Sequence, residues 1–355
     1  MSKFIALYLP QYYPTKENNE WWGAGFTDWR TVNMAKTLFK GHIQPKIPLD
    51  LGYYDLRLSE TRVQQANLAK EYGIDAFCYW HYWFGEGKVL LNRPFDEVVE
   101  TGIPNFPFCL GWANHSWYKK AWGGTGKDKL LIEQKYLGKD DDTQHFYSLL
   151  NAFKDKRYLR HNGKLVFFIY EPLATKCVKD FIITWRKLAK SNGLNDFFFI
   201  GKDKYSQNKK NILDYGFDAI YNDNIFGILH RESKLKKMYR FVKRKIFNLP
   251  MVFNYRDAMK FMLTDEERKE DVIPSIAPNW DHSPRSGTKN PIFINADPCY
   301  FEKLVEQVER IVRDKDNDIV LVKSWNEWGE GNYLEPDLQY GRGMLEALKR
   351  GRNKK

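Results

Sequence analysis

The sequence predicts a single (β/α)8 TIM barrel over residues 1–355, with a basic insertion at 226–254. Eight short β-rich runs alternate with helical patterns, and no linker, repeat or low-complexity tract divides the chain. Aromatic and polar residues gather where these runs end, which is where the active sites of such barrels form. Eight alternations of strand and helix favour a closed barrel over a doubly wound open sheet.

The individual elements follow from local composition. The predicted strands are apolar runs rich in β-branched and aromatic residues, at 4–10, 76–83, 108–114, 165–171, 197–201, 219–222, 272–277 and 319–323. The predicted helices lie between them, at 59–72, 94–101, 140–155, 176–191, 208–215, 255–269, 298–313 and 343–350. Asp297 before Pro298 is typical of a helix start, because aspartate caps the free backbone N–H groups and proline has none to lose. The basic tail at 349–355 is expected to be disordered.

Two acidic residues, Glu327 and Glu330, follow the last predicted strand within the sequence WNEWGEG at 325–331. Cleavage of a glycosidic bond needs one carboxyl group to protonate the departing oxygen and another to attack or stabilise the anomeric centre. Indole rings offer flat surfaces on which sugar rings stack. Solvated loops seldom carry tryptophan at two positions beside acids, so this pattern indicates carbohydrate chemistry. We therefore predict Glu327 and Glu330 as the catalytic residues.

Candidate substrate contacts are the aromatic and polar residues at the carboxyl ends of the predicted strands and in the adjoining loops. Tryptophans are expected to stack on sugar rings, and polar side chains to bind sugar hydroxyl groups. The predicted set is Tyr8, Trp22, Trp80, His81, Trp112, Asn114, His115, Tyr170, Glu171, Trp280, Asp281, Asn326 and Trp328.

The charge and the cysteines limit the class of protein. A net charge of +11 indicates an anionic partner, which could be a nucleic acid, an acidic polysaccharide or a membrane surface. No zinc-finger, RNP-like or homeodomain pattern occurs, so a nucleic-acid partner is not expected. The four isolated cysteines are typical of a reducing compartment. No apolar run is long enough for a membrane span or signal peptide, which predicts a cytoplasmic protein, either free or peripheral to the inner face of the membrane.

The insertion at 226–254 is open to two interpretations. Between 231 and 245 it carries eight Lys or Arg and a single Glu, with Leu235, Met238, Val242 and Ile246 near helical spacing. Such a helix could lie on an anionic membrane, or it could pack on the barrel through its apolar stripe. The narrow stripe favours packing on the barrel.

Neither a metal nor a cofactor is expected. The seven histidines are dispersed and show no paired ligand spacing. The glycine-rich run at 123–127 departs from a phosphate-binding loop, because Ala121 and Asp128 stand where Gly and Ser or Thr are required. No GxSxG motif occurs, which excludes a serine hydrolase of that type.

Several motifs together resemble a known family. They are YLPQYY at 8–13, GFTDW at 25–29, WAN at 112–114, LIEQ at 131–134, PNWD at 278–281 with Arg285, WNEWGEG at 325–331 and LEPD at 334–337. Over nearly its whole length the chain resembles the WbsX-like proteins. This group is often labelled as glycosyltransferases of bacterial surface-polysaccharide clusters, and it is related to glycoside hydrolase family 99, the endo-α-mannosidases and mannanases.

The resemblance implies a (β/α)8 barrel and retention of anomeric configuration through a 1,2-anhydro sugar, in which the 2-hydroxyl of the sugar attacks C1. It implies that Glu327 is the base on that hydroxyl, and that Glu330 is the acid on the leaving oxygen and later the base for water. The implied partner is an oligo- or polysaccharide of O-antigen or capsule metabolism, and the sequence leaves open whether it is lipid-linked. Two alternatives also stay open, a sugar-nucleotide-dependent glycosyltransferase and a non-catalytic glycan-binding protein.

Overall fold

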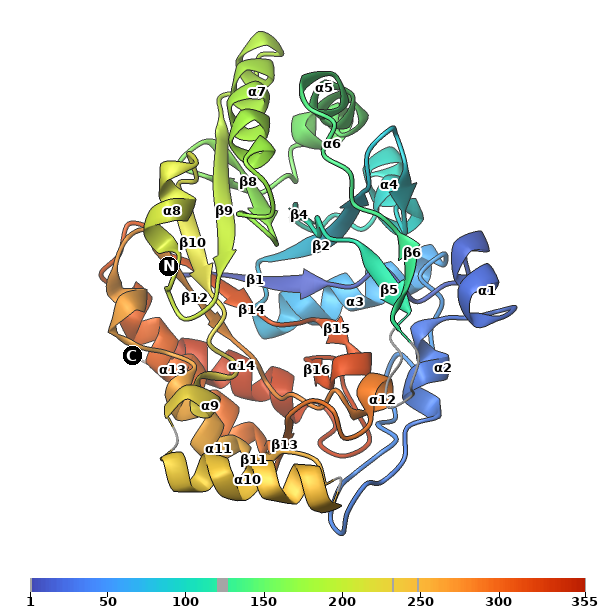
Figure 1. Cartoon of the computed structure of the whole chain (residues 1–355). Coiled ribbons are helices and arrows are strands. Elements are labelled where there is room, and N and C mark those ends of the chain that lie inside the picture. Colours follow the sequence, from blue (N-terminus) through green and yellow to red (C-terminus); the bar gives the residue numbers. More distant parts are fainter. Residues whose placement is uncertain (1, 120–126, 232, 248, 355) are drawn as a thin grey trace.

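The computed structural model describes residues 2–119, 127–231, 233–247 and 249–354. Most of the glycine-rich run at 123–127 lies outside these residues. The chain folds as a ring of parallel strands surrounded by helices (Figure 1).

All eight predicted strands are present and form one closed parallel barrel. They are β1 (Lys3–Tyr8), β2 (Ala76–Trp83), β4 (Phe108–Trp112), β8 (Lys164–Ile169), β9 (Phe197–Asp203), β10 (Ala219–Asn222), β12 (Val272–Ile276) and β14 (Ile319–Val322). Strand β1 pairs in parallel with both β2 and β14, which closes the ring. Two short strands, β3 (Val89–Leu90) and β7 (Arg160–His161), pair antiparallel with β2 and β8. The prediction of a (β/α)8 barrel is confirmed.

Helices cover the outside of the barrel, so the strands are buried on both faces, as in other parallel sheets. Those that match the predictions are α3 (Ser59–Tyr72), α4 (Arg93–Thr101), α5 (Lys139–Ser148), α6 (Leu150–Lys154), α7 (Cys177–Ser191), α8 (Lys209–Asp214), α13 (Pro298–Val312) and α14 (Gly343–Asn353). Asp297 accepts a hydrogen bond from the backbone N–H of Cys299, so α13 is capped as predicted.

The prediction of one helix at 255–269 is wrong. The segment is divided into α11 (Tyr255–Ala258) and the 3-10 turns Met259–Phe261 and Asp265–Arg268. Thr264 starts the last turn with a reciprocal capping box in which the Glu267 side chain bonds back to the Thr264 backbone. Glu267 is fully buried and also accepts hydrogen bonds from Asn222 and Asn224. These contacts tie the last turn to the end of β10 and to the loop that follows it.

The prediction of a disordered tail is also wrong. Helix α14 continues to Asn353 and packs on α13, because basic residues of the tail meet acidic residues of α13 and of the loop before β2. Arg350 and Lys354 pair with Glu302 at distances of 2.8 Å each. Arg352 pairs with Asp75 at 3.0 Å. Acidic residues from other segments thus hold the basic tail in a helix, although its sequence alone is typical of a solvated tail.

Long excursions follow the carboxyl ends of several strands and build one face of the barrel. After β1 come α1 (Lys16–Trp22) and α2 (Asp28–Asn33), and after β4 comes the hairpin of β5 (Trp117–Lys119) and β6 (Lys129–Ile132). After β12 come α12 (Ser283–Ser286) and β13 (Ile292–Ile294), and after β14 come β15 (Asn326–Glu327), the turn Trp328–Glu330 and β16 (Asn332–Tyr333). In the described part of the chain, no helix combines the length and the apolar character needed to cross a membrane.

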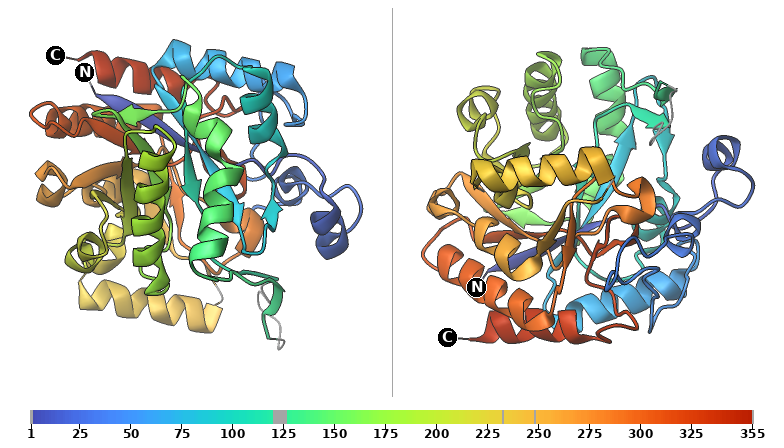
Figure 2. Two further views of the ribbon diagram at one scale, coloured as in Figure 1. Left: turned by 90° about the horizontal axis from the view of Figure 1, so that it is seen from above. Right: turned by 60° about the horizontal axis from the view of Figure 1, so that its bottom comes forward.

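The basic insertion forms α9 (Gly227–Arg231), α10 (Lys234–Phe247) and β11 (Val252–Asn254), which pairs with β13. Helix α10 lies at the edge of the molecule in Figure 1 and in the left view of Figure 2. The expectation that its apolar stripe packs on the barrel is wrong, because the side chains of that stripe are exposed.

Candidate active site

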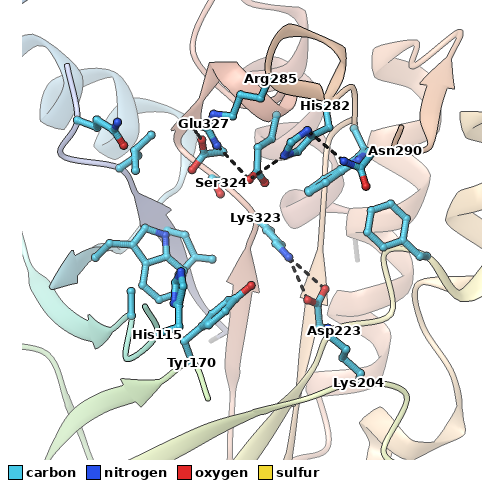
Figure 3. Close-up of a pocket in the computed structure, with 18 of the residues that line it drawn as sticks. His115, Tyr170, Lys204, Asp223, His282, Arg285, Asn290, Lys323, Ser324 and Glu327 are labelled. Atoms are coloured by element: carbon cyan, nitrogen blue, oxygen red, sulfur yellow. Dashed lines mark hydrogen bonds and ion pairs between the residues drawn. The ribbon is translucent and has the colours of Figure 1, made fainter. Parts of the chain in front are cut away.

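A hollow of about 470 Å³ opens at the carboxyl ends of the barrel strands. Its walls come from β1, β2 and the segments that follow β1, β4, β8, β9, β10, β12 and β14. Figure 3 shows Arg285, His282 and Glu327 on one side of this hollow and Asp223, Lys323 and Tyr170 on the other. This is the face on which active sites of the fold form.

Glu327 and Glu330 both line the hollow and are joined by one arginine. The Nη2 atom of Arg285 lies 2.7 Å from Glu327 Oε1, and its Nη1 atom lies 3.0 Å from Glu330 Oε1. Asp28, at the start of α2, lies 2.7 Å from the same Nη2 atom. Three carboxylates from two distant segments therefore share one guanidinium, which limits their mutual repulsion.

Burial raises the pKa of Glu327 above that of an ordinary glutamate, and the charges of Glu330 and Asp28 raise it further, although Arg285 acts in the opposite direction. The side chain of Glu327 is 9% exposed, and that of Glu330 is 24% exposed. His282 Nε2 lies 3.7 Å from Glu330 Oε1. Burial lowers the pKa of His282, which favours its neutral form. The site thus contains one carboxyl group, that of Glu327, that holds its proton more tightly than usual, and a second, that of Glu330, beside the neutral imidazole of His282.

Two glycines fix the turn that carries Glu330. At Gly331 the backbone has a φ of +62°, and a Cβ atom would lie 2.7 Å from the backbone nitrogen of Asp281. At Gly329 a Cβ atom would lie 2.6 Å from both Arg285 Nε and Asp28 Oδ2. Both positions need glycine because neighbouring groups approach closer than any side chain permits. The glycines of the WNEWGEG motif are thus part of the arrangement that holds the two acids.

We expect Gly329→Ala to separate Arg285 from Asp28, since the added methyl group occupies the space between them. Because residues at an active site must hold their positions closely, the variant should lose about 100-fold in kcat while it remains folded. Turnover and thermal unfolding would be measured together. Gly341→Ala is the control, because a Cβ atom at Gly341 meets nothing within 4 Å, so alanine there brings only the backbone strain of a φ of +59°. Equal activity of the two variants would contradict this role for Gly329.

The opposite wall of the hollow carries a second group of charges. Lys323 Nζ lies 3.1 Å from Asp223 Oδ2 and faces the hollow from the end of β14 (Figure 3). Lys202 is buried, with its Nζ atom 3.0 Å from the centre of the Tyr170 ring and 3.6 Å from Glu171. Burial lowers the pKa of Lys202 to about 8. Lys204, also in the lining, is exposed. Both positive and negative charges are thus available on this wall to bind polar substrate groups.

A second hollow continues from the first toward α1 and shares Gln11, His115, Trp117, His282 and Arg285 with it. Its far end carries Trp22, whose ring stacks on Phe26 at a centroid distance of 5.7 Å. The acids therefore lie within a cleft that continues past Arg285 toward Trp22.

The structure brings some of the predicted substrate contacts together. Trp80, His115, Tyr170 and Trp280 line the main hollow with the two acids, and Trp22 lines its extension. The Trp280 indole nitrogen is buried without a hydrogen-bond partner. That nitrogen is therefore available to donate to a substrate oxygen.

Three predicted contacts point away from the hollow, because alternate residues of a strand face opposite sides. Along β2, Trp80 and Tyr82 face inward, whereas His81 faces outward and its Nε2 lies 2.8 Å from His145 Nε2. Tyr8 is also turned outward, and its hydroxyl donates to Gln65 of α3 at 2.7 Å. Trp112 packs against Phe181 of α7 at 4.9 Å. These side chains belong to the interface between the barrel and its helices.

The remaining predicted contacts hold the walls of the site together without lining it. Asn114 bridges β4 and β8 through both backbone polar groups of Glu171. Asn326 likewise bonds to both the N–H and the carbonyl oxygen of Leu9, which joins β15 to the segment after β1. Asp281 is buried and accepts hydrogen bonds from His42 and Gln44, which pin the long loop after β1. Hydrogen bonds from those residues lower the pKa of Asp281 although its burial alone would raise it.

Trp328 is buried beneath the turn, where it stacks on Tyr333 at 3.7 Å and donates to Glu335 at 2.6 Å. Burial raises the pKa of Glu335 to about 7. Glu335 also accepts hydrogen bonds from Tyr54 and Gln65. This buried cluster supports the turn that carries Glu330.

Sequence reasoning missed several residues of the hollow, among them Gln11, Tyr82, Trp117, Lys204, Tyr205, Phe226, His282, Asn290 and Lys323. Arg285 was part of a recognised motif but was given no role. Period-two alternation would have found Tyr82, since it follows Trp80 by two residues in one strand. Trp117 starts the short strand β5, and the others lie outside helices and strands, where spacing carries no such signal.

Comparison with known proteins agrees with this arrangement. The family model described as Glycosyltransferase WbsX matches residues 4–348. The chain belongs to the WbsX family. Two proteins of Xanthomonas campestris pv. campestris, both described as uncharacterized protein WxcX, are 33% and 32% identical to it over 351 residues. These matches cover 97% of this chain and 49% of each relative, so the chain spans about half the length of the curated relatives it matches.

Solved structures share the fold of this WbsX family member. Two structures of the GH99 endo-alpha-mannosidase from Bacteroides thetaiotaomicron give TM-scores of 0.57 and 0.53, at 14% and 16% identity. Each comparison covers 98% of this chain and 95% of the other. A glycoside hydrolase-like protein gives a TM-score of 0.60 at 15% identity, over 100% of this chain and 94% of the other. The family and the fold together place the chain among carbohydrate-active proteins.

Proposed function

We propose that this WbsX protein is a retaining glycoside hydrolase or transglycosylase that acts in the cytoplasm on an oligo- or polysaccharide of bacterial surface-polysaccharide metabolism, including a lipid-linked one. The observation that carries the proposal is the joint position of Glu327 and Glu330 in one cleft, both bound to Arg285. The tryptophans of the cleft supply stacking surfaces for sugar rings.

In the first step, Glu327 takes the proton of the sugar 2-hydroxyl as that oxygen attacks C1. The bond from C1 to the leaving oxygen breaks, and Glu330 gives its proton to that oxygen. In the second step, Glu330 takes a proton from water or an acceptor hydroxyl that attacks C1, and the 1,2-anhydro ring opens with return of the proton from Glu327. Arg285 contacts Oε1 of both acids, so the Oε2 atoms carry the protons in this scheme. The raised pKa of Glu327 makes it a stronger base toward a hydroxyl group.

Sugar-nucleotide-dependent transfer is the second candidate. The description of the family as glycosyltransferases favours it, and so do Lys204 and Lys323 in the lining, which could contact phosphate groups. A third alternative, glycan binding without catalysis, would not require both acids to meet at one guanidinium. The two catalytic alternatives differ in whether a nucleotide leaves.

The deciding experiment is incubation of the protein with surface polysaccharides, α-mannans and sugar nucleotides. Release of reducing ends, or of transglycosylated products, without any nucleotide supports the proposal. Release of a nucleoside diphosphate supports transfer and contradicts it. A glycan found to be a substrate would then be prepared with a methyl group on the 2-hydroxyl of the reacting sugar. This change should abolish turnover, because that oxygen is the nucleophile.

The pH dependence gives a second test. Glu327 must be ionised to act as a base, so kcat/KM should fall as the pH drops through its pKa. Because burial raises that pKa, the acidic limb should lie above the ordinary glutamate value of about 4.3. A pH profile of kcat/KM measures the limb. An acidic limb at the ordinary value would contradict the assignment of Glu327 as the base.

A further inference from the structure

Helix α10 presents its apolar stripe to solvent. Leu235, Met238, Val242 and Ile246 are 74%, 61%, 41% and 69% exposed. They are three or four residues apart, close to one helical turn, so they lie on one face of the helix. A surface helix usually turns such a stripe toward the protein core, so an exposed stripe of this length indicates an interaction surface.

The opposite face of α10 holds the helix to the protein, and it does so with basic side chains. The guanidinium of Arg240 lies 3.7 Å from the centre of the Phe253 ring and donates to the Val252 carbonyl oxygen. Arg244 donates to the Lys289 carbonyl oxygen at 3.2 Å, and Lys237 donates to the His230 carbonyl oxygen at 3.1 Å. These contacts fix the orientation of α10, and they leave the apolar stripe pointing away from the barrel.

We propose that this outward face of α10 is a docking surface for an anionic lipid bilayer. The helix sequence contains seven Lys or Arg among 14 residues and no Asp or Glu. An apolar stripe flanked by basic residues matches the boundary between acyl chains and anionic headgroups, where both components contribute to binding. Self-association through the same face is disfavoured, because it would bring two strongly basic helices together.

The docking surface is joined to the rim of the cleft. The insertion begins at Phe226, which lines the hollow, and β11 at its end pairs with β13. Arg244 contacts Lys289, the neighbour of the cleft residue Asn290. Docking would therefore hold the cleft near the headgroup region, where a lipid-linked glycan is presented. The use of this position for catalysis depends on the proposed function, whereas lipid binding itself does not.

The test is co-sedimentation of the whole chain with phosphatidylcholine vesicles, with and without phosphatidylglycerol. Binding is expected to vesicles that contain phosphatidylglycerol and to weaken as salt is raised. Met238→Ser with Val242→Ser should weaken partitioning at least about tenfold, because two aliphatic side chains no longer enter the bilayer. Lys234→Gln with Lys243→Gln should weaken it about fivefold per charge.

Matched controls lie on other exposed surfaces. Ile183→Ser with Leu338→Ser removes two apolar side chains that are 43% and 59% exposed, and Lys187→Gln with Lys190→Gln removes two charges from α7. Both control pairs should bind vesicles like the unaltered protein. Glu330→Gln should also bind like the unaltered protein, which separates lipid binding from catalysis.

Three results would overturn the proposal. They are vesicle binding by the α10 variants equal to that of the control variants, binding that does not depend on phosphatidylglycerol, and a dimer in size-exclusion chromatography that the Met238 and Val242 substitutions dissociate. The last result would assign the face to a second copy of the chain. Far-ultraviolet circular dichroism of every variant verifies that the fold is retained.

Discussion

Glu327→Gln and Glu330→Gln should each lower kcat by about 10²–10⁴-fold while glycan binding is retained. Glutamine keeps the size of the side chain and its contact with Arg285 through the amide oxygen, but it cannot exchange a proton. Binding would be followed by the fluorescence of Trp80 and Trp280, which line the same hollow. The expected result is thus a large loss of turnover with little change in affinity.

Glu100→Gln is the matched control, because Glu100 is exposed at the end of α4 and does not line the cleft. It should leave both turnover and binding unchanged. If both cleft variants turned over substrate like this control, the assignment of the two acids as catalytic residues would be refuted. If the unaltered protein bound glycans without turnover, and both variants bound them equally well, the non-catalytic alternative would be supported.

Arg285→Met should destabilise the protein in a pH-dependent manner. The substitution leaves Asp28, Glu327 and Glu330 close together without the cation that they share. Loss of one partner of a buried charge pair costs about 3–5 kcal/mol, and the partial exposure of Arg285, at 24%, places this loss near the lower end. Activity should be lost as well, because the two acids would repel each other.

The sign of the pH dependence follows from linkage. Burial already raises the pKa of Glu327 in the folded unaltered protein, and loss of Arg285 removes the cation that opposes this rise. The pKa of Glu327 is therefore higher in the folded variant than in the folded unaltered protein. Relative to the unaltered protein, the pH-dependent part of the stability deficit should be absent at acidic pH, grow as the pH rises above the pKa of Glu327 in the unaltered protein, and be complete above its pKa in the variant. Thermal unfolding of Arg285→Met and of the unaltered protein would be measured between about pH 4 and about pH 9.

Arg57→Met provides the comparison, since Arg57 forms a similarly close pair with Asp55, at 2.7 Å, but at the surface. An exposed pair contributes about 0–1 kcal/mol, so this variant should show little change at any pH. Equal deficits in the two variants, or a deficit for Arg285→Met that grows on acidification, would contradict the role assigned to the shared guanidinium.

Much of the fold could be predicted because its signals are local. The eight strands are short apolar runs between helical patterns, and this alternation is specific for the barrel. Glu327 and Glu330 could also be predicted as a pair, since both belong to one short segment that follows the last barrel strand. Trp80 and Trp280 reach the hollow for a related reason, because Trp80 lies in the carboxyl-terminal half of β2 and Trp280 lies in the loop that follows β12.

The sequence by itself thus determined the barrel, the face that carries the site and the two acids, since neighbours along the chain specify all three. Only the tertiary structure decided that Tyr8, His81 and Trp112 face the helices, because the direction of each side chain depends on strand register. It also decided that Arg285 and Asp28, 257 residues apart, meet at the acids. The tertiary structure also decided that the apolar stripe of α10 faces outward, because Arg240 and Arg244 of that helix bond to backbone carbonyl groups on its other side.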